Sequence, residues 1–274
     1  MSTGKNPGPA VTRTAVTRTA VTRTAGSRLA ALGRAELTLL LRNRVALFTV
    51  LFMPLLMVFA MQSAVSGMDL EGSGLTASGV LMNGLLGMVL LFVVYSNLVS
   101  TYVARREELV LKRLRTGEAS DLEVLVGTAL PGIAVALVQS ALMLAGGVAV
   151  LDLPVPANVP VLLAGLLMGV AMMTAMAAAS TVFTRTAESA QLSTLPLILV
   201  SFLGSGLFVP LGMLPDTVAD VLGLLPFTPV MEIVGAGLAG APAADLLRPS
   251  LVGLVWTGLA VLAVRRWFRW EPRH

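Results

Sequence analysis

Residues 79–103 read GVLMNGLLGMVLLFVVYSNLVSTYV and contain no aspartate, glutamate, lysine, arginine or histidine. A helix rises 1.5 Å per residue, so about 20 apolar residues cross the roughly 30 Å of hydrocarbon in a bilayer. This stretch is therefore long and apolar enough to span a membrane. The whole chain of 274 residues has the same character, since 56% of it is hydrophobic and only 12% is charged. Soluble domains carry roughly 25% charged residues, so we expect a membrane protein.

Five further stretches of similar length predict an all-α membrane protein with six transmembrane helices. None of the six contains Asp, Glu or Lys, and arginine occurs only at the end of the last one. The six predicted spans are residues 45–65, 79–103, 125–150, 159–183, 192–211 and 249–267.

The positive charges predict the orientation, because cytoplasmic loops near span ends retain Lys and Arg. Of the 19 Lys and Arg residues, 18 lie before the first span, in the second and fourth loops, or after residue 264. The alternate loops contain one cation, Arg248, together with the acids Asp69, Glu71, Asp152, Asp216, Asp220, Glu232 and Asp245. We therefore expect both termini in the cytoplasm. This charge pattern also explains the basic balance of the chain without a nucleic-acid partner.

Residues 1–27 form a basic tail in which AVTRT occurs three times. Its arginines are five residues apart, which scatters them around a helix at about 100° per residue and leaves no amphipathic face. Two interpretations stay open: a disordered tail, or a weak attraction to anionic lipid worth about 1 kcal/mol per cation.

Residues 28–44 differ from the tail, because leucines share one side of a helical wheel and arginines share the other. This pattern predicts a helix in the inner membrane interface. Glu36 lies on the leucine side, where it either pairs with a nearby arginine or contacts a partner subunit or neighbouring span.

The inner loop, residues 104–124, contains five cations and five acids. Residues 109–115 predict a short basic helix that ends at Thr116-Gly117, and Ser120 with Glu123 predicts a capping box that opens the next span. The loop is either a solvated connector or a docking surface for another protein. Its density of both charges suits docking better than a simple turn.

Residues 212–240 precede the last span and contain two apolar halves, each too short to cross a bilayer and interrupted at Pro215, Pro226 and Pro229. We expect this segment to be partly re-entrant in the outer leaflet, with protein or a water-filled cavity around its broken backbone. Glu232 has close apolar neighbours on both sides. It is either an interfacial carboxylate or part of a transport pathway.

The sequence lacks the residues that several classes of function require. No G-x-x-x-x-G-K-[ST] motif is present, so the chain is not expected to hydrolyse ATP. The chain has no cysteine, and its one histidine is the final residue, which disfavours His-based catalysis and a metal site. The first five spans contain no titratable Asp, Glu, Lys, Arg or His, which disfavours an ion-coupled carrier. Asn83, Asn97 and Gln139 are too few and too scattered for an intramembrane enzyme.

Three stretches carry a resemblance to a known family, and together they extend over roughly residues 28–270. They are AELTLLLRNRVALFTVLFMPLL (35–56), REELVLKRLRTGEASDLEVLVG (106–127) and FVPLGMLPDTVADVLGLLPFTPVMEIV (208–234). In these stretches the chain resembles the permease subunits of type-2 ATP-binding-cassette (ABC) exporters, which include antibiotic-resistance permeases of actinobacteria. Many members have Thr-Pro where this chain has Thr116-Gly117.

The resemblance implies a permease domain over residues 28–270 of a bacterial cytoplasmic membrane protein, followed by a short tail, 271–274. It implies two copies of a separate ATPase, which would bind ATP and Mg, and a second permease subunit, most simply a homodimer. No cofactor would be bound by this chain itself. The inner loop would dock on the ATPase through Glu107, Glu108, Leu111, Arg113, Leu114, Arg115, Thr116 and Gly117. Glu36 and Arg42 are the candidates from the interfacial helix.

The expected function is export of a hydrophobic or amphipathic compound, such as a drug, an antibiotic or a lipid-like molecule. Apolar spans with few polar groups favour such a cargo over a sugar chain, because a polar cargo calls for hydrogen-bonding residues along its path. The alternative is a membrane component of a drug- or peptide-sensing complex that binds its ligand without moving it.

Overall fold

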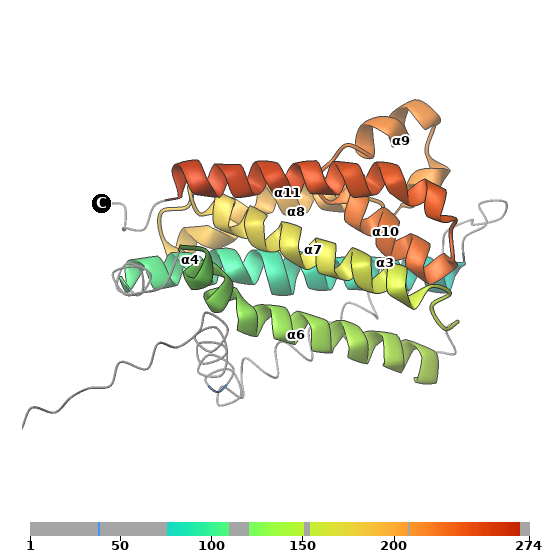
Figure 1. Ribbon diagram of the computed structural model, residues 1–274, viewed down its shortest axis with the longest axis horizontal. Helices are drawn as coiled ribbons and strands as arrows, with labels where there is room; N and C mark the ends of the chain where they lie inside the picture. The colour runs from blue at the N-terminus through green and yellow to red at the C-terminus, as the bar shows by residue number, and fades with distance from the viewer. Residues whose placement is uncertain (1–37, 39–75, 110–120, 151–153, 208, 269–274) are drawn as a thin grey trace, which may run out of the picture.

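The computed structural model describes residues 38, 76–109, 121–150, 154–207 and 209–268, and this part of the chain contains helices and no strand. Five of its helices are long and apolar enough to cross a membrane. They lie side by side along the long axis of the molecule (Figure 1). Their bounds are Ala77–Glu107, Asp121–Ala149, Val159–Ser180, Ala187–Gly204 and Ala244–Trp267.

These five helices correspond to the last five predicted spans. Four of them lie close to the predicted bounds. The other begins at Ala187 and ends at Gly204, whereas hydropathy alone placed it at residues 192–211. Its start is set by a capping box between Thr186 and Ser189, so polar residues form its first turn. The first predicted span, the basic tail and, apart from residue 38, the interfacial helix with Glu36 and Arg42 lie outside the described residues.

The helix at Ala77–Glu107 lies at the centre of the bundle and is the most deeply buried of the five. It consists of α3 (Ala77–Met88), a π-helical segment η1 (Val89–Ser96) and α4 (Asn97–Glu107). At 1.5 Å per residue it is about 46 Å long, which exceeds the hydrocarbon thickness. It contacts α6 (Asp121–Val150), α7 (Val159–Ser180) and α8 (Ala187–Gly204). This helix therefore packs against most of the bundle.

Small residues of α7, Gly165 and Gly169, allow it to approach α10 (Thr228–Ala239) closely. A Cβ at Gly165 would lie 3.0 Å from Val234, and one at Gly169 would lie 2.7 Å from Val230. The closest approach comes from α10, since a Cβ at Gly237 would lie 2.4 Å from the backbone nitrogen of Leu162. Close packing of this kind needs glycine on the facing surface.

The segment between α8 and the last span is broken where the prolines predicted. Pro215 directly precedes α9 (Asp216–Leu222), and Pro229 lies in the first turn of α10. No residue of α9 is buried, and the helix projects from one end of the bundle (Figure 1). In contrast, α10 is largely buried against α3, α7 and α11 (Leu247–Trp267). The first apolar half therefore forms an exposed helix, α9, and the second forms a helix packed inside the bundle, α10.

The helices α6 and α11 present broad apolar surfaces outward. Exposed side chains on these two helices include Val138, Leu142, Leu251, Leu254, Val255, Leu259 and Leu262. Hydrocarbon is a suitable solvent for such a surface, and water is not. Both helices therefore fit the lipid-facing side of a membrane bundle.

Candidate functional site

The two ends of the bundle carry different groups, and each contains a candidate site. The Arg106 end comprises the C-termini of α4, α7 and α11 and the N-termini of α6 and α8. The cavity end comprises the start of α3, the segment 154–158 and the region from Ser205 to Leu247. The five-helix arrangement in Figure 1 places these ends at opposite extremes of the long axis.

Arg106 is the largest fully buried side chain at the Arg106 end, with 1% of its surface exposed. Its Nη1 donates to the main-chain oxygen of Thr181 at 3.0 Å. Its Nη2 donates to the main-chain oxygens of Thr184 at 2.7 Å and Arg185 at 3.3 Å. These carbonyls follow the C-terminus of α7, where helix carbonyls lack intrahelical partners and the helix dipole is negative. The guanidinium therefore donates hydrogen bonds to these carbonyls and places a positive charge at the negative end of α7.

Glu107, the next residue, binds the start of the following helix. Its Oε1 accepts a hydrogen bond from the main-chain N–H of Ala187 at 3.3 Å. Ala187 is the first residue of α8, whose N-terminus is positive and therefore favours a carboxylate. Arg106 and Glu107 thus bind the end of α7 and the start of α8, each with the charge that suits the helix end. We call this pair and the segment 181–187 the Arg106–Glu107 clamp.

Two tyrosines form hydrogen bonds that join the Ala77–Glu107 helix to α6 and α7. The Tyr102 hydroxyl donates to the main-chain oxygen of Leu125 in α6 at 3.0 Å. The Tyr95 hydroxyl lies 3.0 Å from the Ser180 hydroxyl in α7 and shares a hydrogen bond with it. The C-terminal half of this helix is therefore bonded to α6, α7 and α8 at the end from which the inner loop leaves.

Of the predicted docking residues, the structure describes Glu107 and Glu108. Glu107 contacts its own chain, as described above, and Glu108 pairs with Arg105 at 3.7 Å. Leu109, predicted to begin a short helix, has a left-handed backbone with φ of 58° and follows the last turn of α4. Leu111, Arg113, Leu114, Arg115, Thr116 and Gly117 lie outside the described residues.

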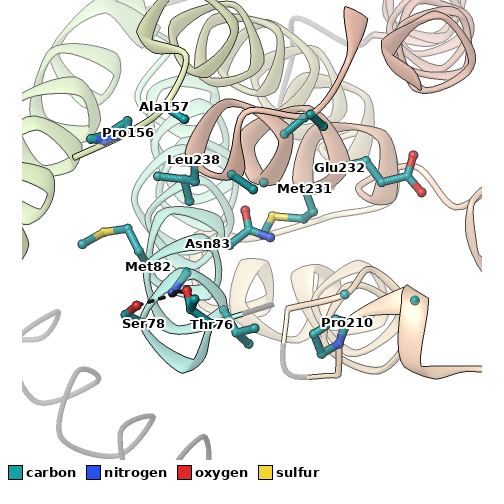
Figure 2. Close-up of a pocket in the computed structure, with 18 of the residues that line it drawn as sticks. Thr76, Ser78, Met82, Asn83, Pro156, Ala157, Pro210, Met231, Glu232 and Leu238 are labelled. Atoms are coloured by element: carbon teal, nitrogen blue, oxygen red, sulfur yellow. Dashed lines mark hydrogen bonds between the residues drawn. The ribbon is translucent and has the colours of Figure 1, made fainter. Parts of the chain in front are cut away.

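A cavity of about 720 Å³ occupies the opposite end of the bundle (Figure 2). It lies between α3, α10 and the segments 154–157 and 205–212. Most of its wall is apolar, and Glu232 lines it. The apolar residues of the wall include Val80, Met82, Leu144, Val148, Val155, Met231 and Leu238.

Two buried oxygen atoms on this cavity have no hydrogen-bond partner within the described part of the chain. One is Oδ1 of Asn83 in α3, and the other is Oγ of Ser205, a fully buried residue. Figure 2 shows the Asn83 side chain facing Met231 between α3 and α10. Gly235 leaves room for the amide, because a Cβ there would lie 3.4 Å from Asn83 Nδ2. Both oxygens are buried beneath the cavity wall and are not exposed on its surface.

Glu232 leaves α10 on the side away from Asn83 (Figure 2). Burial raises the pKa of the Glu232 carboxyl, and the positive charge of Arg248 partly opposes this rise. Arg248 itself binds Asp220, with 2.7 Å between Nη1 and Oδ1. The carboxyl therefore stands in apolar surroundings, and the nearby cation already has an anionic partner.

The sequence reasoning did not single out Arg106 or the two tyrosines. Arg106 is one of five cations in the inner loop, and nothing in the local pattern separates it from Arg105. In the sequence, Asn83 is one of a few scattered polar residues within the spans, and nothing links it to Glu232. Its position on the same cavity as Glu232 depends on the packing of α3 against α10. Among the described residues, no group of three or more His, Cys, Asp or Glu side chains could hold a metal ion.

Comparison with known proteins gives one family. The model of the family described as "ABC-2 family transporter protein" matches residues 59–264. The matched range contains both the Arg106–Glu107 clamp and the cavity. Comparison with curated proteins gave no match.

Proposed function

Since the chain belongs to the ABC-2 transporter family, we propose that it is the permease subunit of an ATP-driven exporter of a hydrophobic or amphipathic compound. The observation that carries this proposal is the Arg106–Glu107 clamp. It connects α4, which leads into the inner loop, with the end of α7 and the start of α8. A permease driven by a separate ATPase needs such a connection between its docking surface and its spans.

The proposed orientation places the Arg106 end in the cytoplasm. Arg105, Arg106, Arg185, Arg265 and Arg266 all lie at this end of the described bundle, whereas the cavity end carries Asp216, Asp220, Glu232, Asp245 and one cation, Arg248. Lys and Arg near span ends are retained on the cytoplasmic side. The cavity then opens toward the outside or the outer leaflet, and α10 is the part of the outer segment that enters the membrane region.

The proposed coupling begins at the inner loop. Residues 110–120 begin shortly after Glu107, the last residue of α4, so a force applied to this loop by an ATPase would act first on the end of α4 that carries Arg106 and Glu107. Because Arg106 is buried and donates to three carbonyls, α4 cannot slide alone without breaking charged hydrogen bonds of about 1.5–3 kcal/mol each. The clamp would therefore pass the movement to α7 and α8 as one unit.

The proposed assembly contains two ATPase subunits and a second copy of this chain. ATP and Mg would be bound by the ATPase subunits, since this sequence has no P-loop motif. The docking contact would be made by Leu111, Leu114 and the cations beside them. A role in drug or antibiotic resistance would follow if the exported compound is toxic to the cell.

The test is transport by the purified permease–ATPase complex in sealed vesicles. We expect accumulation of an amphipathic compound against its gradient when ATP is present, and none with a non-hydrolysable analogue. Binding without ATP-dependent accumulation would instead identify a component of a sensing complex.

A further inference from the structure

We propose that the bundle bends at one layer, formed by η1 of the Ala77–Glu107 helix, Pro131 of α6 and Pro196 of α8, so that the Arg106 end moves relative to the cavity end. We call these three elements the bending layer. That an ATPase drives the movement rests on the proposed function, whereas the flexibility of the layer does not. Three observations lead to it: irregular backbone in three neighbouring helices, a shared depth in the bundle, and hydrogen bonds that join the segments on one side of the layer.

Each of the three helices departs from regular α-helical bonding at one place. Residues Val89–Ser96 form η1, the one π-helical segment among the described residues, with bonds between residues five apart instead of four. Such segments are rare and interrupt α-helices frequently at functional sites. Pro131 and Pro196 lie inside α6 and α8, where proline has no N–H for the bond to the preceding turn. The backbone of each helix is therefore weakest at these points.

Hydroxyl groups beside the two interior prolines do not replace the missing hydrogen bonds. Each proline deprives the carbonyl four residues earlier of its partner. Thr128 Oγ1 donates instead to the main-chain oxygen of Val124 at 2.8 Å, and Thr194 Oγ1 donates to that of Gln191 at 2.8 Å. A hydroxyl has one hydrogen to donate. Neither threonine therefore restores the bond that its neighbouring proline removes.

The contacts of α8 place its proline at the depth of η1. Phe92 packs edge-on against Phe202, and Glu107 bonds the N–H of Ala187. The same interval of 15 residues separates these two contacts on both helices, so the helices run antiparallel at matching depths. The proline of α8 is nine residues beyond Ala187 and therefore lies level with Leu98, two residues after the end of η1.

The proline of α6 lies at the same depth. A Cβ at Gly132, the residue that follows it, would lie 3.8 Å from the main-chain oxygen of Val93 in η1 and 3.5 Å from Cδ2 of Leu98. The three irregular places are therefore separated along the bundle by about one helical turn, roughly 5.4 Å. Three adjacent helices that weaken at one depth can bend together, whereas scattered breaks would oppose one another.

Hydrogen bonds join the segments on the Arg106 side of the layer. Tyr102 of α4 donates to the main-chain oxygen of Leu125 in the first part of α6, and Glu107 bonds the start of α8. We call α4, residues 121–130 and residues 181–195 the Arg106 unit. In contrast, α7, α10 and α11 pack against one another, and in these helices proline occurs only in the first turn. The Arg106 unit meets this second group at the end of α7, where Arg106 binds Thr181.

The first experiment measures distances between pairs of spin labels, which the absence of cysteine allows. Leu122→Cys in the Arg106 unit is paired with Leu262→Cys in α11, across the layer. The controls are Leu122→Cys with Glu188→Cys, within the Arg106 unit, and Leu163→Cys with Leu262→Cys, within the second group. All four positions are exposed. The purified chain is placed in lipid nanodiscs with an excess of unlabelled chain, so that distances within one copy are measured.

We expect the pair across the layer to give a distance distribution about twofold broader than either control pair, since a 15 Å arm that turns through about 20° moves its end by about 5 Å. A distribution as narrow as those of the controls would overturn the proposal.

Proline variants test whether the layer causes this breadth. Pro131→Ala with Pro196→Ala should narrow the distribution across the layer to the width of the controls and raise the thermal unfolding midpoint, because alanine restores both backbone bonds. Pro160→Ala is the matched control. It changes a proline in the first turn of α7, where no helical bond is lost, and should affect neither property. An unchanged breadth in the double variant would refute the assignment.

Deletion of Val93 tests η1 separately. Removing one residue turns a bond between residues five apart into one between residues four apart and leaves the flanking helices in phase. This variant should fold and give a narrower distribution across the layer. Deletion of Met172 from the regular helix α7 should prevent folding, because every later residue turns by about 100°. Equal loss of folding in the two deletions would show that η1 is not a flexible element.

These distances are measured without an ATPase, so they are independent of transport. In the complex, Pro131→Ala with Pro196→Ala should lower ATP-driven export at least about fivefold and leave co-purification of the ATPase unchanged. A broad distribution without any export would support the layer and contradict the proposed function. Wild-type export by the stiffened variant would support the function and contradict a role of the layer in it.

Discussion

The guanidinium of Arg106 donates to the main-chain oxygen of Thr184 at 2.7 Å, across 78 positions of sequence. This contact joins the end of the central helix to the turn between α7 and α8. Glu107 makes the complementary contact 80 positions away, with the N–H of Ala187. Two adjacent residues of one helix thereby hold the turn between two others, at the point where the inner loop leaves the bundle.

The first prediction concerns Arg106. Arg106→Gln should lower the free energy of unfolding by about 2 kcal/mol, since hydrogen bonds from a charged group contribute about 1.5–3 kcal/mol. It should also make ATP hydrolysis by the complex less dependent on substrate, because the spans no longer follow the loop. Arg106→Lys should rescue neither property fully, since an ammonium lacks the planar fork that reaches three carbonyls. Arg105→Gln, on the neighbouring and only partly buried arginine, is the matched control and should behave as wild type.

The second prediction separates two roles of Glu107. If Glu107 serves the N-terminus of α8, Glu107→Gln should lower the unfolding midpoint slightly, by the equivalent of about 0.3–1 kcal/mol, and salt should reduce this difference. Co-purification of the ATPase should stay at the wild-type level. A loss of ATPase binding with an unchanged midpoint would show instead that Glu107 belongs to the docking surface.

The third prediction concerns docking by residues outside the described range. Leu114→Ala and Leu111→Ala should weaken co-purification of the ATPase, because truncating a buried apolar anchor typically costs about 2 kcal/mol or more. Arg113→Ala and Arg115→Ala should mainly slow association and change its salt dependence, since charges at the rim of an interface are screened. The chain should still insert in the membrane in all four variants. Wild-type binding, hydrolysis and export in the double leucine variant would exclude this loop as the coupling element.

The fourth prediction tests the orientation of the bundle. Single cysteines at Thr217 and Glu188 lie on exposed positions at the cavity end and the Arg106 end, respectively. In intact cells, a membrane-impermeant maleimide should label Thr217→Cys and should label Glu188→Cys only after permeabilisation. The reverse pattern would invert the proposed topology.

The fifth prediction addresses the contact between α7 and α10. Gly237→Ala places a methyl group 2.4 Å from the backbone nitrogen of Leu162, which cannot move aside as a flexible side chain can. We expect a loss of about 1–3 kcal/mol in stability, as for other overpacked cores. Gly258→Ala in α11 is the control, because nothing lies within 4 Å of its Cβ. Thermal unfolding of the two purified variants measures the difference.

The sequence alone determined the class of the protein and most of its helix positions. Spans depend on the length of an apolar run, and that length is a local property with a threshold set by bilayer thickness. The breaks at Pro215 and Pro229 were equally local, because proline lacks the N–H that a helix interior requires. The fifth predicted span lies too far toward the C-terminus compared with α8, because a hydropathy criterion does not recognise a helix whose first turn is polar. Residues 187–191 are helical through the Thr186–Ser189 box, and Glu107 adds a partner for Ala187 from a distant helix.

Only the tertiary structure decided which polar residues act together. Arg105 and Arg106 are indistinguishable in sequence, yet Arg106 is buried on three carbonyls and Arg105 pairs with Glu108 near the surface. Asn83, Ser205 and Glu232 are far apart along the chain and line one cavity, where α3 packs against α10 and Ser205 follows the end of α8. Hydropathy and helical periodicity describe one segment at a time. The direction in which each helix faces its neighbours is set by close packing at residues such as Gly165 and Gly237, and this packing selects the partners of every polar side chain.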